Sequence, residues 1–215
     1  MMPTDPSTTS ARRVVIFDMD GTLTRPHLDF DRMRAEIGLA PGPVLEAVLA
    51  MPPKDRAAAE AILQRHEDEA AAASELQPGA TEVIAAVREA GLTPVLMTRN
   101  SRRSVEVVLK RHGLSFDLIR TREDGAMKPS PEPILDICRK LGADAQRSWT
   151  VGDFHYDILC GAAAGCTTVL LLTDDGAQPP WASQADHVIH DLRELLGLLG
   201  IVRAKKPQEG APGRQ

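Results

Sequence analysis

Short apolar runs alternate with stretches of helical periodicity along most of the chain. The apolar runs have the length of buried strands and cover residues 13–18, 93–98, 117–120, 148–153, 166–172 and 187–189. Apolar residues recur every three or four positions in the segments between or after them, namely 81–91, 101–113, 131–142, 157–165 and 191–199. This alternation is typical of parallel strands joined by helical crossovers. It predicts an α/β fold with a Rossmann-like parallel sheet and helices on both faces.

One segment breaks this rhythm. Residues 28–76 contain no strand-like run, only helical patterns that are rich in alanine and glutamate. We therefore expect a small all-helical cap at 28–76, inserted after the first strand of an α/β core made of residues 13–27 and 77–203. Polar residues and prolines dominate at both ends of the chain, so we expect disordered tails at 1–12 and 204–215.

Composition and charge exclude several classes of protein. The chain has 215 residues, 43% of them hydrophobic, which suits one core and a small accessory domain. Its net charge of −5, with no basic run beyond "RAKK", argues against a nucleic-acid partner.

No stretch reaches the ~20 apolar residues of a membrane span, so we expect no membrane partner. Three cysteines without metal-ligand spacing fit a reducing compartment, and we expect a cytoplasmic protein; the oligomeric state stays open.

Polar side chains gather where the predicted strands end. In doubly wound sheets, ligands bind outside the carboxyl ends of the strands. The candidates at these ends, and in one loop that precedes a helix, are Asp18, Asp20, Thr98, Arg99, Asn100, Lys128, Asp153 and Asp157. Each alone has an ordinary explanation, because aspartates cap helices, threonines favour strands and most lysines are solvated. Their concentration at one edge changes this, since clustered carboxylates call for a divalent cation.

Four of these stretches resemble a known family. "DMDGTLT", "MTRNS", "KPSPEP" and "GDFHYD" are similar, in this order, to the four motifs of the haloacid dehalogenase superfamily, whose members are mostly Mg²⁺-dependent phosphohydrolases. The resemblance extends over about residues 14–199. Nearest in appearance are the phosphoglycolate-phosphatase-like members, and residues 28–76 resemble their small helical cap.

The resemblance implies a role for both aspartates of the first motif. Asp18 would be the nucleophile that forms an aspartyl-phosphate. Asp20 would be the general acid and base, an assignment that suits the chemistry because an alkoxide leaves poorly without a proton. Asp20 also argues against dehalogenation, since the true dehalogenases of the superfamily lack this second carboxylate.

The resemblance also implies phosphate and metal ligands. The phosphate-binding residues would be Thr98, Arg99, Asn100 and Lys128, and Arg99 offers charge for a second anionic group. The Mg²⁺ ligands would be Asp18, the backbone carbonyl of Asp20, and Asp153, with Asp157 supporting this site from outside the ligand set. A lysine and a cation together offset the repulsion between a carboxylate nucleophile and a phosphate dianion.

The predicted function is therefore a Mg²⁺-dependent phosphatase for a small phosphorylated metabolite, whose identity the sequence does not reveal. One alternative is a phosphosugar mutase of the same superfamily, in which the aspartyl-phosphate returns its phosphoryl group to the substrate. Another is a non-catalytic binding module. The second alternative fits less well, because none of Asp18, Asp20, Lys128 and Asp153 is missing.

Overall fold

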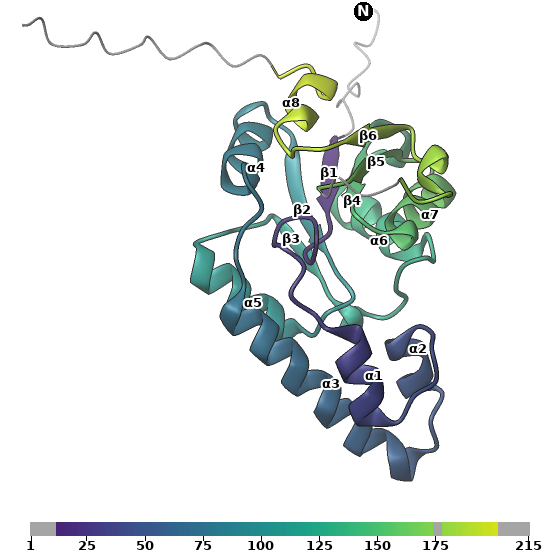
Figure 1. The fold of residues 1–215 in the computed structure, drawn as a ribbon. Helices are drawn as coiled ribbons and strands as arrows, with labels where there is room; N and C mark the ends of the chain where they lie inside the picture. The colour runs from purple at the N-terminus through teal and green to yellow at the C-terminus, as the bar shows by residue number, and fades with distance from the viewer. Residues whose placement is uncertain (1–11, 174–177, 202–215) are drawn as a thin grey trace, which may run out of the picture.

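The computed structural model describes residues 12–173 and 178–201, and these form a parallel six-stranded sheet with helices around it (Figure 1). The strands are β1 (Val14–Phe17), β2 (Thr93–Met97), β3 (Leu118–Arg120), β4 (Trp149–Gly152), β5 (Thr167–Leu171) and β6 (His187–Ile189). Their order in the sheet is β3-β2-β1-β4-β5-β6. Strands β2 and β3 therefore lie on one side of β1, and β4 to β6 lie on the other. The predicted fold class is confirmed. The predicted tails, 1–12 and 204–215, lie outside the described residues, apart from Arg12.

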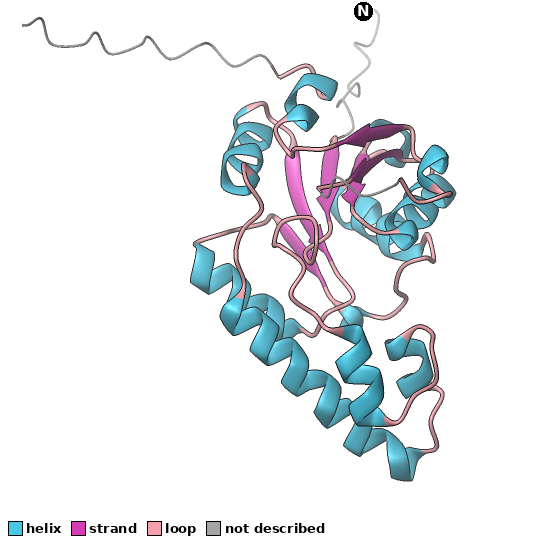
Figure 2. Cartoon of the chain, viewed as in Figure 1, coloured by secondary structure: helices cyan, strands magenta, loops and turns pink. Residues whose placement is uncertain are grey.

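Helices cover both faces of this sheet (Figures 1 and 2). They are α4 (Ala80–Glu89), α5 (Arg102–His112), α6 (Glu132–Leu141), α7 (His155–Ala164) and α8 (Glu194–Leu198). Short 3-10 turns occupy η1 (Arg122–Asp124), η2 (Ala145–Arg147) and η3 (Ala182–Gln184). Helices α4, α5 and α8 contribute to one apolar cluster, and α6 and α7 to clusters on the other side of the sheet.

The alternation of side chains along β1 explains why this strand lies at the centre. Val15 and Phe17 belong to the cluster that contains α4 and α5, whereas Val14 and Ile16 belong to the cluster that contains α6. All four side chains are fully buried, as expected for a strand with helices on both faces. The end of β1 is therefore held rigidly from both sides, which suits a site that needs fixed geometry.

Three helices lie within the predicted insertion: α1 (Phe30–Ile37), α2 (Val44–Leu49) and α3 (Pro53–Ala73). They enclose a small apolar cluster that includes Met33, Val48 and Leu63. Helix α3 is the longest and packs along α5 of the sheet-containing part, as Figure 1 shows. Among the described residues, no helix combines the length and the apolarity needed to cross a bilayer.

Two chain segments connect these three helices to the rest. Thr24 and Leu76 form an antiparallel bridge, and backbone bonds join Arg25 to Glu75 and Gln77 to Leu23. The Gln77 side chain also donates to the carbonyl oxygen of Gly21 at 3.2 Å. The entry and exit of the insertion are thus tied together directly beside the end of β1.

Candidate active site

Strand β1 delivers Asp18 to the carboxyl edge of the sheet, where it meets two residues from other elements. The Lys128 ammonium donates to Asp18 Oδ1 at 2.5 Å and to Asp157 Oδ1 at 2.6 Å. Asp157 comes from the first turn of α7, and Lys128 from the loop before α6. All three side chains are buried. The lysine therefore links the predicted nucleophile to the fourth motif.

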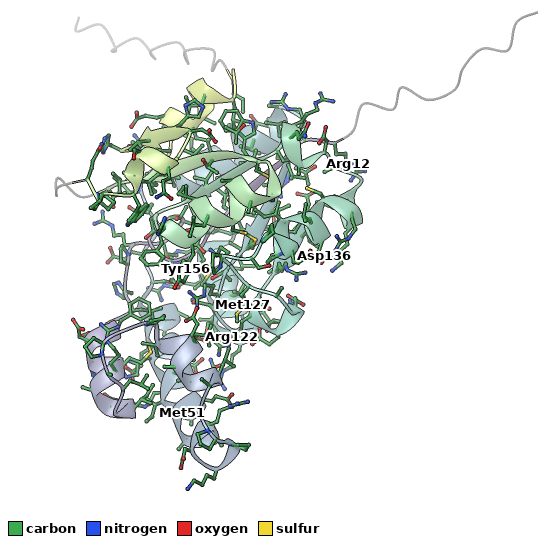
Figure 3. All side chains as sticks on the ribbon, turned by 90° about the vertical axis from the view of Figure 1, so that its right-hand side faces the viewer. Arg12, Met51, Arg122, Met127, Asp136 and Tyr156 are labelled. Atoms are coloured by element: carbon green, nitrogen blue, oxygen red, sulfur yellow. The ribbon has the colours of Figure 1, made fainter. Side chains whose placement is uncertain are left out.

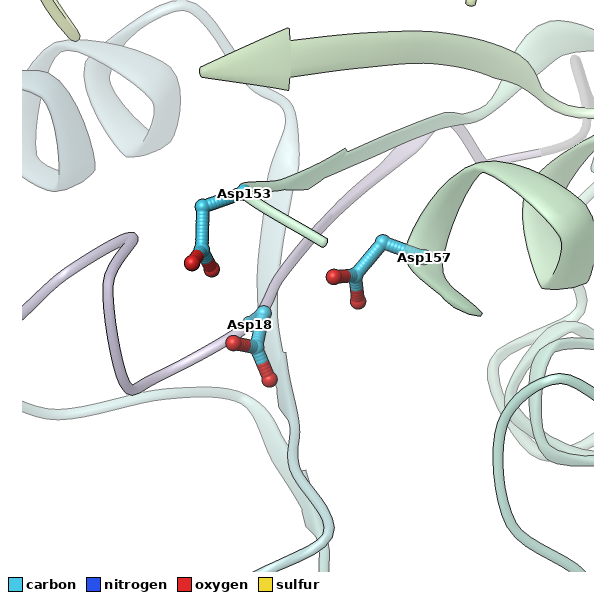
Figure 4. A group of neighbouring side chains, drawn as sticks. All are labelled: Asp18, Asp153 and Asp157. Atoms are coloured by element: carbon cyan, nitrogen blue, oxygen red, sulfur yellow. The ribbon is translucent and has the colours of Figure 1, made fainter. Parts of the chain in front are cut away.

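Three carboxylates converge at this edge, as Figure 4 shows. Asp18, Asp153 and Asp157 each offer one oxygen, and these oxygens lie within 4.8 Å of one another. Burial raises the pKa of Asp153 well above its usual range, and the charges of Asp18 and Asp157 raise it further. Lys128 offsets only one of three negative charges. A hard divalent cation with oxygen ligands, such as Mg²⁺, fits this donor set.

Glycine at two positions makes this convergence possible. Gly21 has φ +82, and a Cβ atom there would lie 2.1 Å from Asp153 Oδ2. A Cβ atom on Gly152 would lie 2.1 Å from Asp157 Cγ. Any larger residue would therefore displace one of the carboxylates, in addition to the backbone strain at position 21. Gly21 thus lets the chain turn directly after Asp20.

Asp20 lies in different surroundings from Asp18. Its Oδ2 accepts a hydrogen bond of 2.5 Å from the Asn100 side-chain amide, and its Oδ1 accepts one of 3.4 Å from the Thr24 hydroxyl. Burial, followed by the nearby charge of Asp18, raises the pKa of Asp20 to about 6. A carboxyl group with such a pKa can both donate and accept a proton near neutral pH.

Burial and charge pairing have opposite effects on the pKa values of Lys128 and Asp157. Burial alone lowers the pKa of Lys128, but the carboxylates of Asp157 and Asp18 overcome this and hold it above its usual range. Burial raises the pKa of Asp157 to about 6, although Lys128 opposes that shift. The ammonium of Lys128 is therefore a fixed positive charge at the site.

The loop after β2 brings the predicted phosphate-binding residues of the second motif to the same edge. Thr98 and Asn100 are buried there, and the Asn100 backbone N–H donates to Thr98 Oγ1 at 3.2 Å. The Arg99 side chain points toward the insertion instead. Its guanidinium donates to Glu46 of α2 at 2.5 Å and lies 4.9 Å from the centre of the Tyr156 ring. The structure thus brings together every predicted site residue except the guanidinium of Arg99, which reaches the insertion.

A second layer of contacts was not predicted from the sequence. Thr22 donates to Asp153 Oδ1 at 2.9 Å, and Glu67 of α3 is buried against Arg122 and the backbone N–H of Ser101. Thr22 stands in the first motif, where its fixed spacing from Asp18 is a usable signal. Glu67 is one of several acidic residues of α3, and Glu46 stands in the short helix α2, so no motif distinguishes either residue in the sequence.

A pocket of about 460 Å³ opens between the insertion and the loop that precedes Lys128. Its walls include Leu45 and Val48 of α2, Gln64 of α3, and Met127. Figure 3 shows Tyr156 and Met127 at the level where the sheet-containing part meets the insertion. Two of its lining residues, Leu45 and Met127, are the chain neighbours of Glu46 and Lys128, but no predicted site residue lines the pocket.

Comparison with known proteins identifies the class of protein. The profile of the haloacid dehalogenase-like hydrolase family matches residues 34–171, more than half of the chain. The chain therefore belongs to this family of hydrolases, as the motifs predicted. The matched range includes Thr98, Lys128, Asp153 and Asp157 but begins after the first motif.

Individual relatives agree. An uncharacterized hydrolase of Saccharomyces cerevisiae is 35% identical over 74% of this chain and 77% of its own length. An N-acetylmuramic acid 6-phosphate phosphatase of Pseudomonas aeruginosa is 30% identical over 87% of this chain and 94% of its own. The crystal structure of a predicted phosphoglycolate phosphatase from Haemophilus somnus shares the fold, with a TM-score of 0.71 and 20% identity over 89% of this chain and 99% of that chain. The prediction of a phosphatase-type hydrolase of this superfamily is confirmed.

Proposed function

We propose that this protein is a Mg²⁺-dependent phosphatase that hydrolyses a small phosphomonoester through an aspartyl-phosphate on Asp18. One observation carries the proposal: two carboxylates two residues apart have different surroundings. Asp18 is paired with the Lys128 ammonium, whereas Asp20 is bonded to Asn100 and Thr24 and has a pKa of about 6. This separation of environments supports a division into nucleophile and general acid.

In the first half of the reaction, a carboxylate oxygen of Asp18 attacks phosphorus while the bond between phosphorus and the leaving-group oxygen breaks. Asp20 gives its proton to that oxygen, so the leaving group departs as an alcohol. In the second half, Asp20 takes a proton from water, whose oxygen attacks the phosphorus of the aspartyl-phosphate. Inorganic phosphate leaves, and Asp18 is regenerated as a carboxylate.

The other predicted residues would hold the phosphoryl group and the metal. Lys128, Thr98 and Asn100 would contact phosphate oxygens, with Arg99 at the edge of this set. Asp18, Asp153 and the backbone carbonyl of Asp20 would hold Mg²⁺, and Asp157 would keep Lys128 in position. When bound, Mg²⁺ offsets negative charge on the transferring oxygens. The substrate would be a small phosphorylated metabolite of the cytoplasm.

The proposal is tested with purified protein on a panel of phosphomonoesters, with Mg²⁺ and with excess EDTA. We expect hydrolysis that EDTA abolishes and added Mg²⁺ restores. Hydrolysis that persists in EDTA, or none on any substrate, contradicts the proposal. A hexose 1-phosphate in the panel addresses the mutase alternative, because a mutase yields the 6-phosphate while a phosphatase releases inorganic phosphate.

The acid role of Asp20 has its own test. Asp20→Asn is expected to slow the hydrolysis of an alkyl phosphate by roughly 10²–10⁴-fold, because the alkoxide then leaves unprotonated. 4-Nitrophenyl phosphate, whose leaving group needs no proton, should lose far less. The measurement is kcat for both substrates, and equal losses on both contradict the acid role.

A further inference from the structure

The loop that carries Lys128 has little backbone bonding of its own. It runs from the end of η1 to the start of α6. Between residues 125 and 130 of the described chain, one backbone-to-backbone hydrogen bond forms, from the Ser130 N–H to the carbonyl oxygen of Met127 at 3.0 Å. The Lys128 side chain is nevertheless only 4% exposed and donates to two carboxylates. Groups outside the loop are therefore needed to fix the position of this lysine.

Cys160 of α7 provides one such group. Its side chain is fully buried, and its thiol donates to the carbonyl oxygen of Ser130, two residues after Lys128, with 2.9 Å between sulfur and oxygen. Burial raises the pKa of this thiol to about 12, so it keeps the proton that it donates. Asp157, three residues earlier on the same face of α7, binds the Lys128 ammonium. One helix therefore holds both the charged end of Lys128 and the backbone that follows it.

Arg120 holds the part of the loop that precedes Lys128. It is the last residue of β3, its side chain is 9% exposed, and its guanidinium is paired with Asp136 of α6. A second guanidinium nitrogen donates to the carbonyl oxygen of Ala126, two residues before Lys128, at 3.5 Å. The backbone of Arg120 is tied to the second motif, because its carbonyl oxygen accepts a bond of 3.0 Å from the Thr98 N–H. Carbonyl groups on both sides of Lys128 thus accept hydrogen bonds from buried side chains of other elements.

The position of Lys128 matters most for one half of the site. Its ammonium would contact phosphate oxygens, and a displacement on the order of 1 Å is enough to weaken a contact of this kind. The proposed metal ligands Asp18 and Asp153 follow β1 and β4 instead, so the loop does not carry them. A change in the anchoring of the loop should therefore affect phosphate binding more than metal binding.

We propose that Cys160 and Arg120 are positioning residues that hold the Lys128 ammonium where it meets the phosphate oxygens of the substrate. The inference rests on the proposed phosphatase function and adds to it two residues that lie outside the four motifs. It also assigns a use to a buried thiol that takes no part in the reaction.

Two substitutions of Cys160 separate its hydrogen bond from its packing. Cys160→Ala removes the donor, whereas Cys160→Ser keeps one. Calorimetric titration with inorganic phosphate, in saturating Mg²⁺, measures the first dissociation constant, and titration with Mg²⁺ alone measures the second. We expect Cys160→Ala to raise the phosphate Kd about 3- to 10-fold and Cys160→Ser to stay within about twofold of the wild type. The Mg²⁺ Kd should be unchanged in both variants. Equal losses of phosphate affinity in Cys160→Ala and Cys160→Ser would show a packing role and overturn the assignment.

A matched control removes a second buried thiol from the same apolar cluster. Cys166 is 5% exposed, belongs to that cluster with Cys160, and precedes β5 rather than lying on α7. Cys166→Ala should shift the urea midpoint about as much as Cys160→Ala does and leave the phosphate Kd unchanged. A rise in the phosphate Kd as large as that of Cys160→Ala would overturn the inference.

Arg120→Lys tests the other anchor. The ammonium keeps a charge for Asp136 but replaces the two guanidinium nitrogens by one, so we expect the phosphate Kd to rise about 2- to 5-fold. An unchanged phosphate Kd in Cys160→Ala or in Arg120→Lys overturns the role of that residue, and equal losses of phosphate and Mg²⁺ affinity overturn it as well. Because binding is measured without turnover, a wild-type protein that binds phosphate but hydrolyses no phosphomonoester refutes the proposed function alone. A wild-type protein that binds no phosphate overturns both.

Discussion

The sheet-containing part and the helical insertion are built in contrasting ways. Around β1 the sheet is buried on both faces by large apolar clusters, and the polar groups at its edge are concentrated in the candidate site. The insertion encloses only a small cluster around Met33, Val48 and Leu63. It meets the rest of the molecule largely through polar pairs, among them Glu46 with Arg99 and Glu67 with Arg122.

Under the proposed function, this contrast suggests that the sheet edge carries the reaction and that the insertion influences which substrate binds. The buried strands β1 and β4 hold Asp18 and Asp153, and the loop before α6 adds Lys128 at the same edge, which suits the reacting groups of the proposed function. The insertion contributes side chains that pair across the junction, such as Glu46 with Arg99 and Glu67 with Arg122. Under the proposed function, we expect substitutions in α2 and α3 to alter substrate choice more than they alter the positions of Asp18, Lys128 and Asp153.

The strongest way to test this separation is Asp18→Asn. We expect kcat to fall on the order of 10⁴-fold or more, because the nucleophile is lost. Stability should change little, since Lys128 keeps its buried bond with Asp157. Steady-state kinetics and urea unfolding measure the two effects. Appreciable residual turnover contradicts the nucleophile assignment, and a large loss in the free energy of unfolding contradicts the expectation that stability changes little.

Glu67→Gln, at the junction between the insertion and the sheet-containing part, should reduce stability where Asp18→Asn reduces turnover. Glu67 is buried, and it binds the Arg122 guanidinium and the backbone N–H of Ser101. Removing its charge leaves the mostly buried Arg122 with only a long bond to Gln64 and a 3.9 Å ion pair with Glu123, and we expect a loss of about 2–4 kcal/mol in the free energy of unfolding.

The matched control for that variant is Arg103→Gln. Arg103 and Asp68 also join α5 to α3, at 2.9 Å, but the arginine side chain is 72% exposed. Its loss should cost no more than about 1 kcal/mol in urea unfolding. Equal losses in the two variants would show that burial of the Glu67 pair does not matter.

The smallest expected effect is the pH dependence of stability in EDTA. Burial raises the pKa of Asp20 and of Asp157 to about 6, and that of Asp153 is raised too. The folded protein therefore binds more protons than the unfolded chain between about pH 4 and 6. The free energy of unfolding should rise by an amount on the order of 1–2 kcal/mol as pH falls from 8 to 5. This added stability should be lost as pH rises through 6.

Thermal unfolding at pH 5, 6, 7 and 8 measures this dependence. Excess Mg²⁺ should reduce it, because a cation favours the ionised carboxylates and stabilises the folded state at the higher pH values. A decrease in stability from pH 8 to 5 in EDTA would contradict the assignment of raised pKa values to this cluster.

Much of the fold could be predicted because the signals are local. The run at residues 13–18 becomes β1, and the periodic segments at 101–113 and 131–142 become α5 and α6 within a residue or two at each end. Strand β4 is predicted equally well. Helix α7 begins at His155, two residues before the predicted start, because Phe154 occupies the N-cap position and Asp157 bonds back to its N–H.

The candidate site was predictable for a similar reason, and only in part. The motifs name residues that follow strand ends, and a parallel sheet brings such ends to one edge. The bond from Asn100 to Asp20 and the pairing of Arg99 with Glu46 were not predictable. Both depend on side chains 80 and 53 positions apart, for which one sequence carries no pairing signal.

The sequence by itself determined the parallel sheet, the helical segment after the first strand, and the identity of the carboxylates and the lysine at the sheet edge. Those features follow from periodicity and from residues at strand ends, which are properties of neighbouring positions. Only the tertiary structure decided the environments: that Lys128 binds both Asp18 and Asp157, that Asp20 is buried beside Asn100, and that Arg99 turns to Glu46. Burial and distance arise only when distant segments pack together, and they set the charge and the proton affinity of each group.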